Sequence, residues 1–347
     1  MSARYLVTAM GGDIGGSVVR CLRKEFPKEN LFGCDITPYV AEREEVGRFF
    51  LMPPYVEEER YLRTLLQECR QYEITHILPM TEGEIKLFDK YREVFASEGL
   101  KIMINRSDIL QIAFSKFNTA MAVAKMGLNS PKTWMIEDAI EELSYPVIIK
   151  PDNGCGSRGI QIIHDEQEYK IASFQKTDMI VQEYIGTAEE EYTVGLFSNG
   201  KDMKSIAFKR SIGYGGMSKR VERIEDRKID QIVHTVADTF ELEGAINIQM
   251  RKQDGEYYIF EINPRISSTV GFRYLLGFKD VKWWLDLLDG KKERINYIPE
   301  KKPVIGIRTL SEKIYLGGGI KLSDSYSLLL GYRNNLMAEK LDYEYAA

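Results

Sequence analysis

A predicted β-hairpin carries the side chains with the clearest chemical potential in this sequence. Two stretches of alternating polar and apolar residues, 244–250 and 256–263, flank a Gln-Asp-Gly turn, which is a typical hairpin pattern. Successive side chains of a strand point to opposite faces. Gln249 therefore lies on a polar face of the first strand, and Glu261 and Asn263 share a polar face of the second.

The length of the connecting loop decides which of these side chains meet. A loop with an odd number of residues places Gln249 opposite Glu261, whereas an even loop places it opposite Phe260, which shares the other face with Ile262. Because polar side chains are expected to face each other, we favour the odd loop. Gln249, Glu261 and Asn263 then converge on one surface.

The three converging side chains suit a magnesium site. Mg²⁺ binds oxygen ligands, commonly one or two carboxylates together with nucleotide phosphates and water. Arg265 follows directly after the second strand, where a guanidinium can meet further negative charge. An ordinary polar sheet face is the simpler interpretation, but it explains a single glutamate better than it explains Gln, Glu, Asn and Arg together.

A glycine-rich segment, residues 153–159, joins two apolar stretches directly after Lys150 and Pro151. Backbone N–H groups in such a loop can wrap phosphate oxygens. The segment is not a P-loop, because no Gly-Lys-Ser/Thr follows. A plain hairpin turn is the alternative, although three glycines and an arginine are an unusual way to make one. Cys155 has no histidine near it in the sequence, so a catalytic thiol is disfavoured.

An earlier glycine cluster, residues 11–16, lies between an apolar strand and a helix, and Asp35 ends the next strand. A dinucleotide-binding turn requires the pattern G-x-G-x-x-G, and no frame of this cluster satisfies all three positions. We therefore expect a tight strand-to-helix turn. An NAD(P)-dependent Rossmann oxidoreductase that uses this turn and Asp35 is the alternative function.

The elements that must position these residues alternate between strand and helix over the first hundred residues. Strands are expected at 5–9, 31–35, 75–79 and 100–104. Apolar side chains recur at helical spacing at 18–22, 62–69 and 87–95. Alternation of this kind predicts an α/β fold with a doubly wound parallel sheet and helices on both faces.

The pattern changes after about residue 110, and the C-terminal part is predicted to be α+β. Helices 107–114 and 116–126 lead to a compact block with strands at 146–150, 159–163 and 179–183 and a helix near 165–175. Strands then dominate, at 191–197, 203–209, 244–250 and 256–262, with one helix around 229–240.

The composition is that of an ordinary globular chain. Of 347 residues, 44% are hydrophobic and 29% charged, and the net charge is -5. This excludes disordered, collagen-like and coiled-coil proteins and gives no general attraction to nucleic acid or membranes. The four cysteines and three histidines are scattered, unlike the clustered ligands of zinc sites. Free thiols, with no leader pattern and no long apolar run, predict a cytoplasmic protein.

The order of the motifs resembles that of an ATP-grasp enzyme, most closely the ATP-grasp half of the carbamoyl-phosphate-synthetase large subunit and its stand-alone carboxylate–amine ligase relatives. The likeness covers roughly residues 1–310. Its motifs are Lys116, Lys150-Pro151, the 153–159 loop, Gln182-Glu183-Tyr184-Ile185, Glu191-Tyr192, Gln249 and Phe260-Glu-Ile-Asn-Pro-Arg265. Ser115 departs from the aspartate common in the family, and Asn153 and Cys155 replace usual flap residues.

The resemblance implies roles for these residues and implies ATP and Mg²⁺, with Mn²⁺ as an alternative, as cofactors. ATP would be bound by Lys116, Lys150, Gly154, Gly156, Ser157, Gln182, Glu183, Tyr184, Ile185 and Glu191. In the family two lysines hold the phosphates, which suits Lys116 and Lys150. The hinge segment, residues 182–185 in this sequence, meets the adenine, and a glutamate, here Glu191, binds the ribose. The metal would be held by Gln249, Glu261 and Asn263, and the catalytic cations would be Arg265, Lys209 and Arg210.

The loop after the predicted strand 75–79 carries Thr81, Glu82 and Glu84. Ligands of α/β sheets bind at the carboxyl ends of the strands, so the two glutamates could contact a substrate amine. Thr81 and Glu84 also fit a helix capping box, which explains them without any ligand. We assign neither glutamate a catalytic role.

The sequence thus predicts a Rossmann-like pre-ATP-grasp domain at 1–110, an ATP-grasp small lobe at 111–190, a large lobe at 191–320 and a tail at 321–347. The predicted activity is an ATP-dependent ligase that joins a carboxylate to an amine or ammonia through an acyl phosphate. A non-catalytic ATP-binding protein is a second alternative. The expected partners are small-molecule carboxylate and amine substrates, not nucleic acid or a membrane, and a homodimer is an option for the assembly.

Overall fold

The computed structural model of this chain describes residues 3–138, 143–154 and 159–309. Its strands form three sheets, which lie one after another along the chain. Each sheet falls inside one of the predicted regions 1–110, 111–190 and 191–320, whose boundaries stay predictions. The predicted tail at 321–347 lies outside the described residues.

The first sheet is parallel, with its five strands in the order β3-β2-β1-β4-β5. The strands are β1 (Tyr5–Val7), β2 (Leu31–Asp35), β3 (Arg48–Leu51), β4 (His76–Leu78) and β5 (Lys101–Ile102). The helices are α1 (Asp13–Leu22), α2 (Glu58–Gln71), α3 (Glu82–Lys90) and α4 (Arg92–Ser97). Helix α1 packs on one face and α2, α3 and α4 on the other, which confirms the doubly wound sheet.

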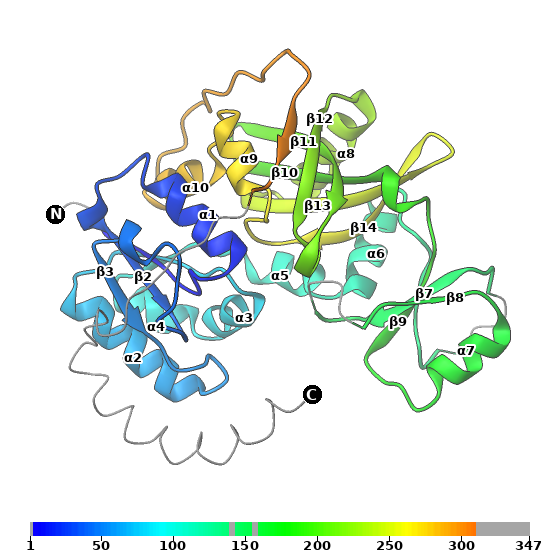
Figure 1. Cartoon of the computed structure of the whole chain (residues 1–347), viewed down its shortest axis with the longest axis horizontal. Helices are drawn as coiled ribbons and strands as arrows, with labels where there is room; N and C mark the ends of the chain where they lie inside the picture. Colours follow the sequence, from blue (N-terminus) through cyan, green and yellow to red (C-terminus); the bar gives the residue numbers. More distant parts are fainter. Residues whose placement is uncertain (1–2, 139–142, 155–158, 310–347) are drawn as a thin grey trace.

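The second sheet forms a small lobe that projects away from the rest of the molecule (Figure 1). Helices α5 (Ser107–Ala113) and α6 (Lys116–Lys125) precede it. Its antiparallel strands, in the order β6-β9-β7-β8, are β6 (Thr133–Met135), β7 (Val147–Pro151), β8 (Gln161–Ile163) and β9 (Met179–Glu183). The lobe also contains helix α7 (Glu166–Ser173).

The third sheet is antiparallel, in the order β14-β13-β10-β11-β12-β15. Its strands are β10 (Glu191–Asn199), β11 (Met203–Ile212), β12 (Ser218–Ile224), β13 (Glu243–Gln253), β14 (Glu256–Asn263) and β15 (Ile305–Ile307). The remaining helices are α8 (Arg227–Thr239), α9 (Val270–Leu275) and α10 (Asp280–Leu288). The mixed architecture confirms the α/β and α+β assignments.

Two apolar clusters sandwich the third sheet. On one face, α8 packs on β10, β13 and β14 together with side chains from α5 and α6. On the other face, Phe208 of β11 shares a cluster with Val270 of α9, Trp284 of α10 and Val18 of α1. Helices α9 and α10 thus join the large sheet to the N-terminal sheet. The polar face of the β13–β14 hairpin therefore lies toward the N-terminal part of the chain.

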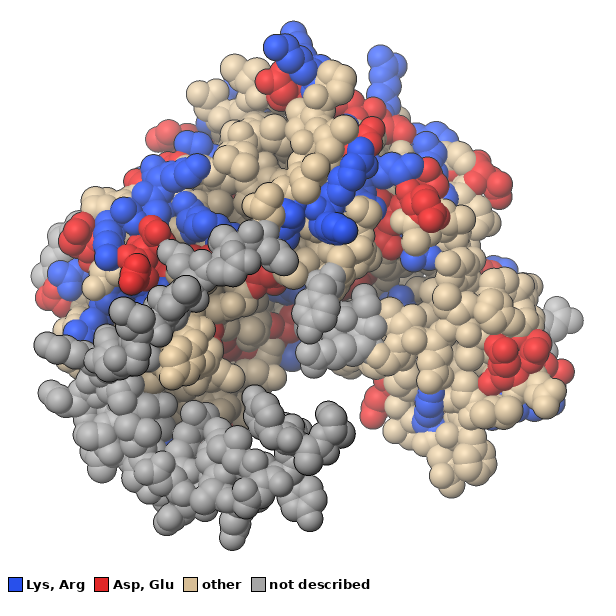
Figure 2. Space-filling view, in the orientation of Figure 1, with Lys and Arg blue, Asp and Glu red and all other residues tan. Residues whose placement is uncertain are grey.

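The surface and the free thiols agree with the composition. Figure 2 shows Lys and Arg side chains interspersed with Asp and Glu on the visible face. Cys21, Cys34 and Cys69 are buried free thiols. Within the described ranges, no helix has both the length and the apolar character needed to cross a membrane.

Candidate active site

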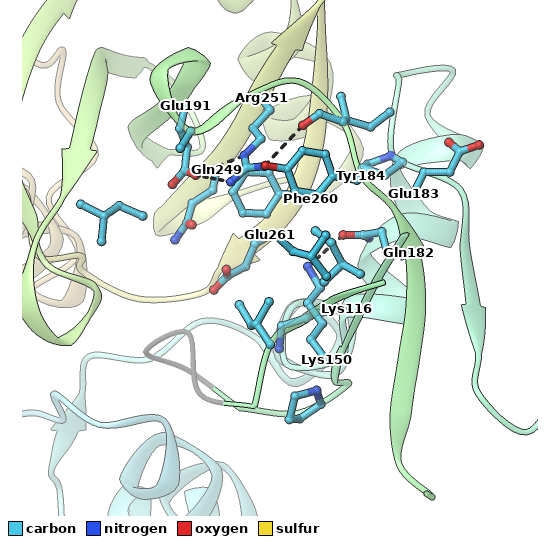
Figure 3. A pocket seen from close by; sticks show the side chains of 18 of the residues that line it. Lys116, Lys150, Gln182, Glu183, Tyr184, Glu191, Gln249, Arg251, Phe260 and Glu261 are labelled. Carbon is cyan, nitrogen blue, oxygen red and sulfur yellow. Dashed lines mark hydrogen bonds and ion pairs between the residues drawn. The ribbon is translucent and has the colours of Figure 1, made fainter. Parts of the chain in front are cut away.

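A cavity of about 330 Å³ lies between the small lobe and the large sheet (Figure 3). Its walls come from β7, β9, β10, β11 and the β13–β14 hairpin, with Lys116 from the start of α6. Predicted nucleotide residues that line it are Lys116, Lys150, Gly154, Gln182, Glu183, Tyr184, Ile185 and Glu191. Gly156, Ser157 and Cys155 of the predicted flap lie outside the described residues.

The hairpin brings Gln249 opposite Glu261, as predicted, but for a different reason. The turn contains only residues 254–255, so the loop is even, and a regular register would place Gln249 opposite Phe260. A β-bulge next to the Gln249–Glu261 pair makes Phe260 the extra residue and restores the pairing. The predicted odd loop was therefore wrong, although the pair that it predicted is confirmed.

The same bulge changes the side on which Phe260 lies. We expected Phe260 and Ile262 on the face opposite Glu261. Ile262 is in the core beneath the sheet, but Phe260 lines the cavity next to Glu261 (Figure 3). Its ring centroid lies 5.5 Å from Lys150 Nζ, so the bulge adds an aromatic wall to the cavity.

Lys150 projects from the end of β7 into the cavity, and only 5% of the residue is exposed. Its Nζ donates a hydrogen bond to Gln182 Oε1 at 2.8 Å, and Gln182 in turn donates to Thr133 Oγ1 at 2.8 Å. Burial lowers the pKa of the Lys150 ammonium to about 8. Lys116 and Arg251 lower the pKa further, and the carboxylates of Glu261 and Glu191 raise it.

Lys116 begins helix α6 beside the glycine-rich loop. Its Nζ donates to the carbonyl oxygens of Asp152 at 3.1 Å and Gly154 at 3.0 Å. The cap of this helix is Ser115, whose hydroxyl accepts a bond from the backbone N–H of Asn118. The departure from the family's aspartate at position 115 therefore preserves the capping function.

The hinge segment after β9 is already partly engaged. The backbone N–H of Glu183 donates to the Lys132 carbonyl oxygen at 3.0 Å, and that of Tyr184 donates to Pro146 at 3.3 Å. The Glu183 carboxylate accepts a bond from the Lys132 N–H at 3.0 Å. Contacts of this segment with an adenine stay a prediction, and these two N–H groups are already used in forming the hinge.

Glu191 lies between two arginines and is 3% exposed. Its Oε1 accepts bonds from Arg210 Nη2 at 2.7 Å and Nε at 3.1 Å, and its Oε2 accepts bonds from Arg251 Nη2 at 3.2 Å and Nε at 3.3 Å. Arg210 Nη2 also donates to Gln249 Oε1 at 2.8 Å. Arg210 thus connects the predicted ribose ligand to a predicted metal ligand.

Arg251 is a residue that the sequence analysis missed. Its guanidinium lies 5.3 Å from the Tyr184 ring centroid and 6.0 Å from that of Phe260, within reach of a cation–π interaction. The signal was present, because Arg251 continues the alternation that places Asn247 and Gln249 on the polar face of the strand.

A second cavity of about 250 Å³ adjoins the first and reaches the N-terminal sheet. The two cavities share Arg210, Ile212, Gln249 and Glu261 in their walls. The second cavity is also lined by Asn263 and Arg265 from the end of the hairpin, and by Asp13, Met80, Thr81 and Glu82 from the N-terminal part. Predicted metal ligands therefore stand where the two cavities meet.

Two of the predicted catalytic cations, Arg265 and Lys209, lie outside the first cavity. Arg265 Nη2 donates to Glu82 Oε1 at 2.9 Å, which brings Glu82 into the second cavity. Lys209 does not join Arg210: it pairs opposite Tyr192, on the other face of the sheet, and its ammonium contacts Glu190. The structure therefore separates the predicted basic pair and gives Lys209 no place at the site.

The loop at 81–84 combines a structural and a cavity role. Thr81 and Glu84 form the capping box of α3, and Glu84 is buried, with its carboxylate accepting a 2.6 Å bond from Tyr61. The structural interpretation of Glu84 is therefore confirmed. Glu82 alone of the two predicted glutamates lines the second cavity.

The first glycine cluster forms the strand-to-helix turn that we expected. The Gly11 N–H donates to Asp35 Oδ2 at 2.9 Å, and a Cβ at Gly15 would lie 2.6 Å from the Ala9 carbonyl oxygen. Asp13 adds a second carboxylate at the start of α1. The Asp13 carboxylate lies at the helix start where a dinucleotide pyrophosphate would have to bind, which counts against the oxidoreductase alternative.

The oxygen ligands at the junction of the two cavities fit an Mg²⁺ ion that is also bound by the phosphates of a nucleotide. Gln249, Glu261 and Asn263 supply oxygen ligands, of which one is a carboxylate, and Mg²⁺ usually completes such sites with phosphates and water. Among the described residues, no group of three or more His, Cys, Asp and Glu could hold a metal.

Comparison with known proteins finds two family models that match successive parts of the chain. A family model described as an ATP-grasp domain matches residues 113–269, and a PylC-like N-terminal domain matches residues 6–103. The carbamoyl phosphate synthase large chain of Campylobacter jejuni is 23% identical over 205 residues, which cover 53% of this chain and 19% of that protein. This chain thus spans about a fifth of that relative's length.

Solved structures with the same fold include two nucleotide complexes. N5-carboxyaminoimidazole synthetase from Staphylococcus aureus, complexed with ADP, has a TM-score of 0.71 and 15% identity, covering 96% of this chain and 86% of that one. The biotin carboxylase domain of 2-oxoglutarate carboxylase from Hydrogenobacter thermophilus, in complex with MgADP, ADP and bicarbonate, has a TM-score of 0.71 and 15% identity, covering 89% and 75%. The motifs, the sheets and the two matches agree, and this chain carries an ATP-grasp domain that is preceded by a PylC-like N-terminal domain.

Proposed function

We propose that this protein is an ATP-dependent ligase that joins a carboxylate to an amine or ammonia and releases ADP and phosphate. The observation that carries the proposal is the meeting of two cavities at Gln249 and Glu261. One cavity has buried cations and an aromatic wall suited to a nucleotide, and the other is smaller and polar. A phosphoryl group at the junction would be within reach of a ligand in either cavity.

The nucleotide would be held by the charged side chains of the first cavity. Lys116 and Lys150 would neutralise its phosphates, since an ammonium is a compact point charge. The hinge after β9 and the ring of Phe260 would enclose the base, and Glu191 would meet the ribose. Gln249, Glu261 and Asn263 would hold Mg²⁺, or Mn²⁺ in its place, and the metal would neutralise charge on the transferred phosphoryl group.

The reaction would proceed in two steps. A carboxylate oxygen attacks the γ-phosphorus, the bond to the bridging oxygen of ADP breaks, and an acyl phosphate forms. The amine then attacks the acyl carbon, loses a proton and expels phosphate. Arg265 would steady the transferred group with Arg210 nearby, so that the protein contributes mainly positioning and charge neutralisation.

The test is ADP release with Mg-ATP over a panel of carboxylic acids, with hydroxylamine as the acceptor. We expect ADP that depends on one acid, together with its hydroxamate, and a loss of both in Glu261→Gln. Glu256→Gln serves as the control, because Glu256 lies on the same hairpin, is exposed and contacts Lys228 rather than either cavity. ATP binding without ADP release on any acid would instead favour the non-catalytic nucleotide-binding alternative. The cytoplasmic location and a homodimer stay predictions.

A further inference from the structure

The Glu191 carboxylate in the wall of the first cavity has no acceptor position left for a ligand. Its two oxygens accept four hydrogen bonds, two from Arg210 and two from Arg251, and a carboxylate offers about four lone-pair sites. The proposed ribose contact needs at least one of these sites for a sugar hydroxyl. A ribonucleotide that uses Glu191 must therefore displace bonds from one of the two arginines.

The two arginines hold Glu191 unequally. The bonds from Arg210 are 2.7 and 3.1 Å long, and its Nη2 also donates to Gln249 at 2.8 Å. Those from Arg251 are 3.2 and 3.3 Å long, beyond the length of about 2.7–2.9 Å that is usual for a charged pair. The Arg251 side chain is also 19% exposed, against 7% for Arg210. Arg251 is therefore the partner that a ligand displaces more easily.

Arg251 lies between Glu191 and the rings of Tyr184 and Phe260, and all four residues line the first cavity (Figure 3). Its guanidinium has other contacts at this place. The two ring centroids lie 5.3 and 6.0 Å away, and Nη1 donates to the Ile185 carbonyl oxygen at 3.5 Å. Release of Glu191 therefore does not leave the cation without partners, because the hinge and the two rings remain within its reach.

We propose that Arg251 covers Glu191 in the free protein and competes with the ribose of the nucleotide for this carboxylate. The inference rests on the proposed function, because it concerns the nucleotide of that reaction. It makes Arg251 a specificity-determining residue that sets how strongly the site distinguishes one sugar from another.

The competition has a consequence that depends only on the sugar. A ribonucleotide gains hydroxyl bonds to Glu191 but loses the two bonds from Arg251. A nucleotide that lacks both hydroxyls leaves Arg251 in place, so that it gains nothing and loses nothing at this carboxylate. The wild-type protein therefore distinguishes the two nucleotides less than a site without Arg251 would.

The test measures the Kd of Mg-ADP and of Mg-2′,3′-dideoxy-ADP by calorimetry at neutral pH. The ratio of the dideoxy value to the ADP value reports the sugar, because the base and the phosphates are the same in both nucleotides. In Arg251→Met we expect this ratio to rise about tenfold, since the ribose no longer displaces a charged hydrogen-bonding partner. Arg251→Lys keeps the positive charge but cannot form the paired bonds of a guanidinium, and the ratio should rise there as well.

Two further variants show whether the gain passes through Glu191. Arg220→Met is the matched control and should keep the wild-type ratio, because Arg220 is exposed on β12, pairs with Glu222 and lines neither cavity. Combining Glu191→Gln with Arg251→Met should remove the gain, because the ribose then has no carboxylate to bind.

The outcomes separate this inference from the proposed activity. An unchanged or lower ratio in Arg251→Met, or in Arg251→Lys where the first variant does not fold, overturns the competition. A gain that persists in the double variant overturns it too, because the gain then does not depend on Glu191. In both cases ADP still binds, and the ligase proposal is left to its own test of ADP release. A wild-type protein that binds neither nucleotide overturns both proposals.

Discussion

Nucleotide binding is expected to weaken above about pH 8, because the charge that Lys150 would offer to the phosphates is lost there. Lys150 is 5% exposed, and its burial is the main reason why the pKa of its ammonium falls from 10.5 to about 8. A bound polyphosphate would stabilise the charged form and raise the pKa again. Binding above pH 8 must therefore be accompanied by proton uptake.

The size and sign of the effect follow from the same pKa. The fall from 10.5 to about 8 corresponds to about 3 kcal/mol for keeping the ammonium charged in the folded protein. Between these pH values the unfolded chain binds more protons, so the free energy of unfolding rises with pH by up to that amount. Nucleotide affinity changes in the opposite direction, and its Kd should increase by up to about tenfold per pH unit.

Calorimetric titration of Mg-ADP between about pH 7 and pH 9.5 tests this, in buffers of different ionisation enthalpy that report the proton uptake. Lys150→Met should bind weakly, with a Kd that changes little over this range. Lys116→Met is the comparison, since it removes a phosphate-facing cation but leaves Lys150 in place. Urea unfolding of the wild type and Lys150→Met over the same range measures the stability change. Parallel pH profiles for these two proteins in both assays would refute the reasoning.

Three further predictions concern other residues of the site. Glu191→Gln should lower the free energy of unfolding by about 3 kcal/mol in urea denaturation, because the buried charges of Arg210 and Arg251 lose the carboxylate that neutralises them. An unchanged free energy of unfolding would mean that water already solvates both guanidinium groups. Thr81→Ala should cost about 1 kcal/mol in the same assay through the lost cap of α3, and a neutral result would contradict the capping box. Arg265→Met should lower ADP release about 100-fold but leave ADP affinity unchanged in calorimetry, because Arg265 lines only the second cavity; a parallel loss of affinity would place it in the nucleotide site.

Much of the N-terminal fold could be predicted because its strands are short apolar runs bounded by turns and its helices have one apolar face. The short strands β3, β6, β12 and β15 were missed. Their residues do not alternate strongly. Strands β6 and β15 pair with partners that are distant in the sequence, whereas β3 and β12 pair with the strands that directly precede them. Helices α9 and α10 were also missed, although they join the two largest parts of the molecule.

The nucleotide cavity could be predicted further than the second cavity. The nucleotide side chains lie in short motifs that carry the family resemblance, so that Lys150, Gln182 and Glu191 could each be found through that resemblance. The contact of Glu82 with Arg265 joins residues that are 183 positions apart, and neither local pattern contains information about the other. Asp13 appeared only as part of a glycine turn, and its position in a cavity depends on how α1 packs against α9.

The β-bulge of the hairpin shows how a correct pair can follow from an incorrect register. Parity alone links loop length to pairing only when both strands are regular, and one additional residue reverses the rule. The chemical argument, that a polar residue should face a polar residue, constrained the pair more strongly than the count of loop residues did. The bulge also gives Phe260 and Glu261, adjacent in sequence, the same cavity, which a regular strand cannot do. Because one wall therefore presents both an aromatic ring and a carboxylate, removing the bulge should separate the base-binding surface from the metal ligand.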